Sequence, residues 1–106
     1  MSNLTVNEIE FLKGIDASEY GDYLVDDIWF FSVKDNCELS KAQMGGVTAS
    51  LIEKGLIVVQ GENTRHKIGN ECGEYEHIVR MTAEGIAAYV ATVGAENVNK
   101  LVEVSA

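Results

Sequence analysis

The sequence lacks the features that mark secreted, membrane-spanning and disulfide-stapled proteins. Only two of its 106 residues are cysteines, Cys37 and Cys72. Two cysteines do not make a disulfide framework, so we expect both as reduced thiols. No apolar run approaches the roughly 20 residues that cross a bilayer. Residues 1–11 contain no basic region followed by an apolar segment, which a signal peptide needs. These absences predict a cytoplasmic protein with no membrane contact.

Basic side chains are also scarce, and they are unevenly placed. Eight lysine and arginine residues stand against 17 aspartate and glutamate residues, which gives a formal net charge of −9. Residues 39–70 contain four of the basic residues and only two of the acidic ones, so this segment alone has a positive balance. An acidic protein is repelled by nucleic acid unless a local basic face compensates. Only this segment is therefore a candidate for contact with a polyanion.

Composition and length predict one folded domain. Hydrophobic residues make up 46% of the chain, which is typical of a folded protein and not of a disordered one. A chain of this length buries a sufficient core without metal or disulfides. The sequence contains no internal repeat and no low-complexity segment. We therefore predict a single domain over residues 1–106, in which residues 95–106 are a candidate dimerisation tail.

Three helix starts carry capping residues at the required spacing. Thr5 and Glu8 form the pattern of a capping box, and Ser40 and Gln43 repeat it. Thr82 begins a third start, although the residue that would complete its box is a glycine. In a capping box the first side chain accepts a hydrogen bond from the backbone N–H three residues on, and that residue's side chain accepts one from the backbone N–H of the first residue. The three starts predict helices over residues 6–15, 41–54 and 83–93.

The segment from residue 22 to residue 33 fits two kinds of element. Leu24, Ile28 and Phe31 recur at helical spacing, whereas the aromatic and β-branched content of residues 28–31 also suits a strand. We predict a helix over 22–33. Elsewhere the pattern predicts strands over 56–60 and 74–81, a polar loop over 61–73 and a short terminal helix that includes Val98, Leu101 and Val102.

The helix predicted over 41–54 has the clearest buried stripe. Met44, Val47 and Leu51 fall at i, i+3 and i+7, so one face of this helix should pack on the core. Gly55 follows as the residue that adopts a left-handed cap most readily. The order of a capped helix, a strand, a second strand and a further capped helix is typical of a winged helix-turn-helix domain.

Residues 39–89 carry a resemblance to a known family. The stretch SKAQMGGVTASLIEKGLI over 40–57 resembles the recognition helix and first wing strand of winged-helix transcriptional regulators of the MarR type. Residues 81–85, MTAEG, are similar to the Leu-Thr-x-x-Gly that follows the wing in that family. The resemblance implies an α+β winged helix-turn-helix with a three-helix core, a two-stranded β-hairpin wing and a C-terminal helix. It also implies that helix 41–54 enters a DNA major groove while loop 61–73 contacts the minor groove or backbone.

The resemblance implies a set of DNA-binding residues, which this chain fills only in part. Gln43 is the one plausible base reader, and Ser40 and Lys41 are placed for phosphates. The remaining implied contacts come from Lys54 and from the wing residues Arg65, His66 and Lys67. Family members usually carry arginines and other long polar residues along the DNA-facing side of the helix. Here that side consists mainly of Ala42, Gly45, Gly46, Ala49 and Ser50.

An alternative hypothesis is an acidic winged-helix module that binds a protein and not DNA, such as a phage-like accessory factor or a DNA mimic. The acidic residues before and within the predicted helix 22–33 cluster around Tyr20 and Tyr23; they are Asp16, Glu19, Asp22, Asp26 and Asp27. Asp22, Asp26 and Asp27 are the candidate contacts with a protein partner. Spaced carboxylates imitate phosphates, and aromatic side chains are favoured at protein interfaces. Under the leading hypothesis the protein is a small transcriptional regulator, and pairing through its tail as a homodimer would present two recognition helices to a palindromic site.

Neither catalysis nor cofactor binding is expected. The sequence offers no Ser-His-Asp arrangement, phosphate-binding glycine loop or pair of catalytic carboxylates. His66, Cys72 and His77, with Cys37 as a fourth ligand, match no zinc spacing. We therefore predict no catalytic residues, no cofactor and no metal.

Overall fold

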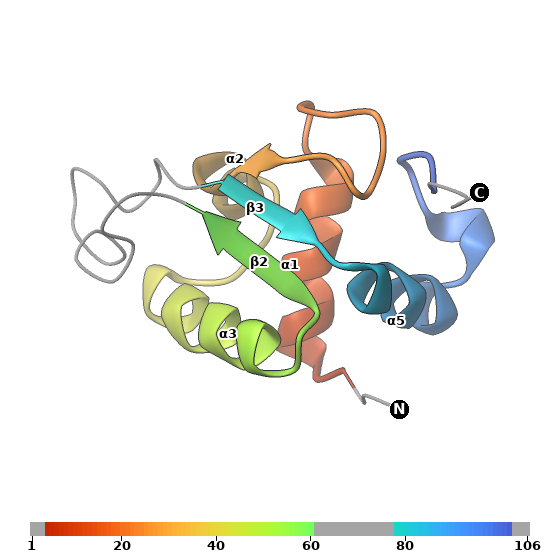
Figure 1. Cartoon of the computed structure of the whole chain (residues 1–106). Helices are drawn as coiled ribbons and strands as arrows, with labels where there is room; N and C mark the ends of the chain where they lie inside the picture. The colour runs from red at the N-terminus through yellow and green to blue at the C-terminus, as the bar shows by residue number, and fades with distance from the viewer. Residues whose placement is uncertain (1–3, 61–77, 103–106) are drawn as a thin grey trace.

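Helices surround one face of a small antiparallel sheet in the computed structural model (Figure 1). The structure describes residues 4–60 and 78–102. Its α+β composition agrees with the sequence-based prediction. In chain order the elements are α1 (Val6–Ala17), β1 (Ile28–Trp29), α2 (Phe30–Asp35), α3 (Lys41–Glu53), β2 (Ile57–Gln60), β3 (Ile78–Met81), α5 (Ala83–Val93) and the 3₁₀-helix η1 (Ala95–Asn97).

All three predicted helix starts are confirmed. The Thr5 hydroxyl accepts a hydrogen bond from the Glu8 N–H at 3.1 Å, and the Glu8 carboxylate accepts one from the Thr5 N–H at 2.9 Å. Ser40 and Gln43 form the same reciprocal pair at the start of α3. The Thr82 hydroxyl accepts from the backbone of the third residue of α5. Each cap satisfies an N–H that has no partner within its helix, which is why local spacing predicts these starts well.

The sheet has three strands and not the two of the predicted wing. Its strand order is β1-β3-β2, and both pairings are antiparallel. Ile57 lies opposite Met81 and Val59 opposite Val79, so β2 and β3 pair along their described length. β1 is short and pairs with the other side of β3, where Ile28 lies opposite Val79.

The helix predicted over 22–33 is wrong for most of its length, since β1 precedes a helix that begins only at Phe30. One oxygen of the Asp26 carboxylate accepts hydrogen bonds from the backbone N–H groups of Asp22 and Tyr23, both at 2.9 Å. Such a side-chain turn competes with helical hydrogen bonding. Ile28 is fully buried, whereas Trp29 beside it is exposed. This is the alternation of a strand, as the β-branched and aromatic content had also indicated.

The short terminal helix predicted around residues 98–102 is also wrong. After α5 the chain makes one turn of 3₁₀-helix and then runs extended beside the segment that precedes β1. The Leu24 N–H donates to the Leu101 carbonyl, and the Leu101 N–H donates to the Asp22 carbonyl, both at 2.9 Å. Backbone pairing with a distant segment satisfies these groups in place of helical bonds.

Buried polar groups fasten this C-terminal segment to α1. The carboxylate of Asp16 accepts hydrogen bonds from the Tyr89 hydroxyl at 2.8 Å and from the N–H groups of Asn99 and Lys100 at 2.9 and 2.8 Å. The Lys100 ammonium in turn donates to three carbonyls of residues 18–21, at 2.6 to 2.8 Å. We call Asp16, Tyr89, Asn99 and Lys100 the C-terminal clasp. Burial raises the pKa of the Tyr89 hydroxyl and lowers that of the Lys100 ammonium.

The hydrophobic core lies where α1, α2 and α3 meet the sheet. Met44, Val47 and Leu51 are buried as their spacing predicted. At the start of α5, Gly85 lies so close to the preceding chain that an added Cβ would approach the Leu56 carbonyl oxygen to 2.0 Å. The remaining core residues are Phe11, Leu12, Ile15, Leu24, Ile28, Phe30, Val33, Leu39, Leu56, Ile57, Val79, Met81, Ile86 and Tyr89. None of the helices in the described parts of the chain has the length and apolar character needed to cross a membrane.

We expect Asp16→Ala to destabilise the fold by about 2–4 kcal/mol. The substitution leaves the Tyr89 hydroxyl and two backbone N–H groups without their acceptor, and buried unpaired donors are costly. Urea unfolding followed by circular dichroism measures the change. Asp22→Ala is the matched control, because that side chain is exposed, and its effect should stay within about 0.5 kcal/mol. Equal effects of the two variants would show that the clasp does not hold the fold.

Candidate functional site

The outward face of α3 includes four small residues, two glycines and two alanines. Burial of Met44, Val47 and Leu51 turns the opposite side of the helix toward solvent. Among the described residues, a Cβ added at Gly45 or at Gly46 would meet no atom within 4 Å. Packing against residues 4–60 and 78–102 therefore requires neither glycine. The exposed residues of α3 are Lys41, Ala42, Gln43, Gly45, Gly46, Ala49, Ile52 and Glu53.

Four of these exposed residues form one stripe along the helix. Ala42, Gly45, Gly46 and Ala49 recur at i, i+3, i+4 and i+7, which places them on one side of α3. We call them the α3 stripe. Each helical glycine costs about 1 kcal/mol relative to alanine, and no close packing against the part of the chain that the structure describes offsets that cost. A face of glycines and alanines lets another molecule approach the helix backbone closely.

Ser40 and Gln43 have a structural task in addition to the predicted contact with DNA. The Ser40 hydroxyl accepts from the Gln43 N–H at 3.1 Å, and the Gln43 side-chain oxygen accepts from the Ser40 N–H at 2.8 Å. The box holds the Gln43 side chain against the first turn of α3. Its amide NH₂ group remains for a partner, whereas its oxygen already has a hydrogen bond. This arrangement favours a donor contact from Gln43.

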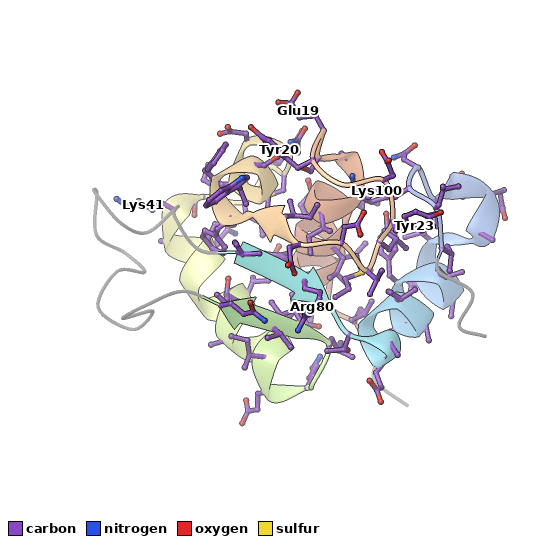
Figure 2. All side chains as sticks on the ribbon, turned by 45° about the horizontal axis from the view of Figure 1, so that its top comes forward. Glu19, Tyr20, Tyr23, Lys41, Arg80 and Lys100 are labelled. Atoms are coloured by element: carbon purple, nitrogen blue, oxygen red, sulfur yellow. The ribbon has the colours of Figure 1, made fainter. Side chains whose placement is uncertain are left out.

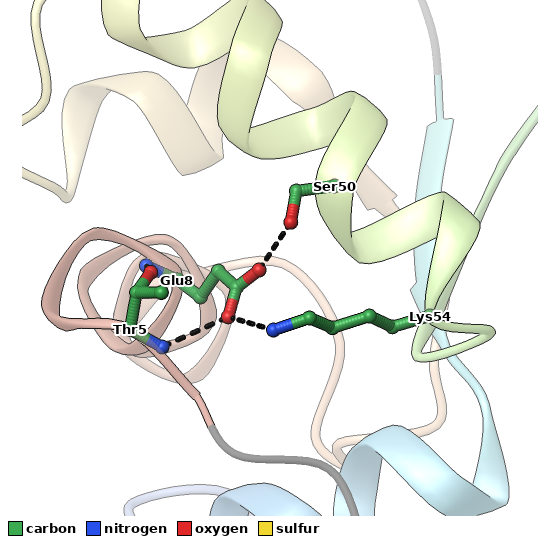
Figure 3. Close-up of polar contacts among 4 residues, drawn as sticks. All are labelled: Thr5, Glu8, Ser50 and Lys54. Atoms are coloured by element: carbon green, nitrogen blue, oxygen red, sulfur yellow. Dashed lines mark hydrogen bonds and ion pairs between the residues drawn. The ribbon is translucent and has the colours of Figure 1, made fainter.

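Lys54 lies in an internal ion pair. Its ammonium is 2.8 Å from a carboxylate oxygen of Glu8, a side chain that is only 2% exposed. The Glu8 carboxylate also accepts from the Thr5 N–H at 2.9 Å and from the hydroxyl of Ser50 (Figure 3). We call Thr5, Glu8, Ser50 and Lys54 the α1–α3 link. Sequence reasoning assigned Glu8 to the cap alone and Lys54 to DNA, because it could not place residues 46 positions apart beside each other.

The link keeps Glu8 ionised in a buried position. Burial by itself raises the pKa of this carboxyl. The hydrogen bonds from Lys54, Ser50 and Thr5 together lower it by more than burial raises it, so the pKa of Glu8 lies below the usual 4.5. A buried charge is tolerated where donors surround it. The hydrogen bonds from Ser50 and Lys54 hold the C-terminal end of α3 against α1. They therefore help to set the direction in which the α3 stripe faces.

The other predicted DNA-binding residues are only partly placed. Lys41 is exposed at the N-terminal end of α3, on a different side of the molecule from Lys100 (Figure 2). Arg65, His66 and Lys67 lie outside the described residues, as does the rest of the predicted loop 61–73. The structure therefore brings Ser40, Lys41 and Gln43 together at one helix end and places Lys54 at the other.

Comparison with models of known protein families, with curated protein sequences and with solved structures gave no match. The reading of the site thus depends on the residues and on their geometry.

The acidic face proposed for protein binding is only partly available. Asp16 belongs to the C-terminal clasp and Asp26 forms a turn, so both carboxylates act within the chain. Asp27 lies 3.6 Å from Arg80 in an exposed ion pair. Asp22 is exposed, and its charge favours the protonated Lys100 ammonium. The sequence groups these residues only by their positions in the chain. In the structure, Asp16 and Asp26 bind backbone N–H groups, whereas Asp22 and Asp27 are exposed.

The candidate metal ligands are only partly within the described residues. Within residues 4–60 and 78–102 no group of three or more histidine, cysteine, aspartate or glutamate side chains could hold a metal ion. His66, Cys72 and His77 lie outside those ranges. Burial raises the pKa of the Cys37 thiol, which makes that cysteine a poor nucleophile.

We expect the stabilising effect of Glu8 to disappear as the pH falls. Its pKa is lower in the folded than in the unfolded chain, so its contribution is complete above about pH 4.5 and is lost as the pH falls through the folded-state pKa. Glu8→Gln should therefore destabilise by about 1–3 kcal/mol at pH 7 and by less at pH 3. Urea midpoints at the two pH values measure this difference.

The matched control is Glu53→Gln, which removes a charge from an exposed position on α3. Its effect at pH 7 should stay within about 0.5 kcal/mol. If the free energies of unfolding of Glu8→Gln and the wild type differed as much at pH 3 as at pH 7, the ionised link would be contradicted.

Proposed function

We propose that the protein is a winged-helix DNA-binding protein, a small transcriptional regulator similar to the MarR type. One observation carries the proposal. The elements follow one another as helix, strand, helix, helix, strand and strand. Within this arrangement α3 has its apolar residues buried and its opposite face exposed. A helix held in this way after a short turn from its predecessor is the arrangement in which recognition helices enter the major groove.

Three local features support the same proposal. α2 and α3 are separated by only five residues, 36–40, which is a short turn for two helices. Lys41 and Ser40 stand at the N-terminal end of α3, where backbone N–H groups and the helix dipole favour phosphate. The α3 stripe leaves the helix backbone accessible, so shape and backbone contacts would dominate over base reading by long side chains.

The direct test is a fluorescence-anisotropy titration with mixed-sequence duplex DNA at low and moderate salt. We expect saturable binding that weakens with salt, because lysine and arginine contacts release counterions from DNA. Gly46→Glu should reduce affinity at least about tenfold, since it places a carboxylate in the centre of the α3 stripe. Glutamate is a better helix former than glycine, so the variant should remain folded.

Ala87→Glu is the matched control, because it adds the same charge at an exposed position of α5. Its affinity should stay within about twofold of the wild type. Arg65→Ala and Lys67→Ala should each weaken binding to all sequences and flatten its salt dependence. Absence of duplex binding at low salt, or equal losses for the two glutamate variants, would contradict the proposal and favour the protein-binding module.

Dimerisation through the C-terminal segment remains a prediction. Leu101 is 57% exposed although its backbone is paired, and Val102 is 38% exposed. We expect a dimeric mass by light scattering at micromolar concentration, and a monomeric mass for Leu101→Asp. Val6→Asp, which puts the same charge at an apolar side chain that is 81% exposed on α1, should remain dimeric. A monomeric wild type would exclude this mode of pairing.

A further inference from the structure

Three aromatic side chains contact one another on the surface, away from the α3 stripe. The rings of Tyr20 and Phe31 meet edge to face at 5.9 Å, and those of Trp29 and Phe31 stack at 5.9 Å. Their exposed fractions are 37%, 40% and 36% for Tyr20, Trp29 and Phe31. We call these three residues the aromatic patch. Contiguous exposed aromatic surface is unusual on a small domain and is typical of interfaces.

The patch is assembled from three parts of the chain. Tyr20 lies on the loop between α1 and β1 (Figure 2), Trp29 ends β1 and Phe31 belongs to α2. The sequence predicted Phe31 to be part of a helical stripe with Leu24 and Ile28, but only those two residues are fully buried. β1 changes the spacing, so Phe31 turns outward and joins the other two rings.

Each ring has an acidic residue within four positions of it in the sequence. Glu19 precedes Tyr20 and is exposed. Asp27 and Trp29 are both exposed on either side of the buried Ile28, so they point to the same side of the extended chain.

On α2, Phe31 and Asp35 are four residues apart and both exposed, which places them on one helix face. Asp35 stands in the last turn of that helix, where a negative charge opposes the helix dipole and adds no stability. In the parts of the chain that the structure describes, the carboxylates of Glu19 and Asp35 take part in no hydrogen bond or ion pair. Asp27, by contrast, is already paired with Arg80 at 3.6 Å, so Glu19 and Asp35 carry the argument. The half-buried Lys34 is the nearest basic residue in the sequence.

We propose that the aromatic patch binds an arginine-rich segment of a partner protein. A guanidinium group stacks on aromatic faces and pairs in a planar fork with carboxylates, so both components of this surface attract it. A nucleic acid would be repelled by the same carboxylates. A second copy in a symmetric contact would bring Glu19 and Asp35 close to their own equivalents. The inference does not depend on DNA binding by α3.

The patch contains its own reporter, since Trp29 is the single tryptophan of the chain. The experiment titrates the full chain with an oligoarginine peptide and with an oligolysine peptide of equal length, and follows Trp29 emission. We expect a saturable change with both peptides and an affinity about two- to fivefold higher for oligoarginine, because only the guanidinium stacks well on the rings.

Charge neutralisation at matched positions locates the binding. Asp35→Asn should reduce oligoarginine affinity about threefold or more, whereas Glu84→Gln should reduce it less than about 1.5-fold. Both variants remove one exposed carboxylate from the beginning or end of a helix, but Glu84 lies on α5. Phe31→Ala should remove the preference for arginine over lysine, and circular dichroism verifies that it is folded.

Several outcomes would overturn the proposal. Equal losses for Asp35→Asn and Glu84→Gln, or equal affinities for the two peptides, would show attraction by net charge alone. An unchanged Trp29 emission at saturation would place the peptide elsewhere. A self-associated wild type that becomes monomeric with Phe31→Ala would assign the patch to a second copy of the chain.

Discussion

The buried carboxylate of Glu8 is the contact on which the placement of α3 depends. One oxygen accepts from Thr5 and Lys54, and the other from Ser50. It thereby caps α1 and anchors the last turns of α3 at the same time. An ionised group this deeply buried is tolerated only while its donors remain, so the geometry of two helices is coupled to a single charge. Together with the burial of Met44, Val47 and Leu51, this contact sets the direction in which the α3 stripe faces.

Asp16, near the other end of α1, is a second buried carboxylate that accepts hydrogen bonds from distant parts of the chain. At about 100° per residue, Glu8 and Asp16 point in directions about 80° apart. One helix can therefore hold α3 on one side and the C-terminal segment on another, and Figure 1 shows α3 and α5 on opposite sides of α1. Both carboxylates sit among hydrogen-bond donors from distant parts of the chain, the Asp16 contacts spanning 73 to 84 residues. In this acidic protein, two of the negative charges are thus part of the interior framework.

Particular residues show why some of this could be predicted and some could not. The caps at Thr5, Ser40 and Thr82 are contacts over three residues, so spacing alone predicts them. The pairing of Glu8 with Lys54 depends on how α1 and α3 cross, which no local pattern specifies. The same limit explains the error over residues 22–33. Helical spacing there is real, but Asp26 forms a turn and β3 offers Ile28 a pairing partner from 51 positions away.

Of the candidate site, the sequence correctly predicted the capped start of α3 and its buried face. It also noted the small residues opposite, although only the structure shows that no neighbour in the described chain requires Gly45 and Gly46. Lys54 was assigned to DNA through the resemblance and the positive balance of residues 39–70, neither of which indicates its pairing with Glu8. The aromatic patch was missed as a unit, because its rings become neighbours only once β1 redirects the chain into α2.

The net charge of −9 is compatible with DNA binding because of the size of the molecule. Its extents are 36 × 24 × 22 Å, whereas charges are screened beyond about 8 Å at physiological ionic strength. A phosphate that contacts the N-terminal end of α3 therefore experiences Lys41 far more strongly than carboxylates on the opposite side of α1, such as Glu84 and Glu96. The carboxylates of the acidic surface attract or repel only those groups of a partner that lie within this screening distance. An acidic exterior and a locally neutral α3 stripe can thus serve two partners of opposite charge on one small domain.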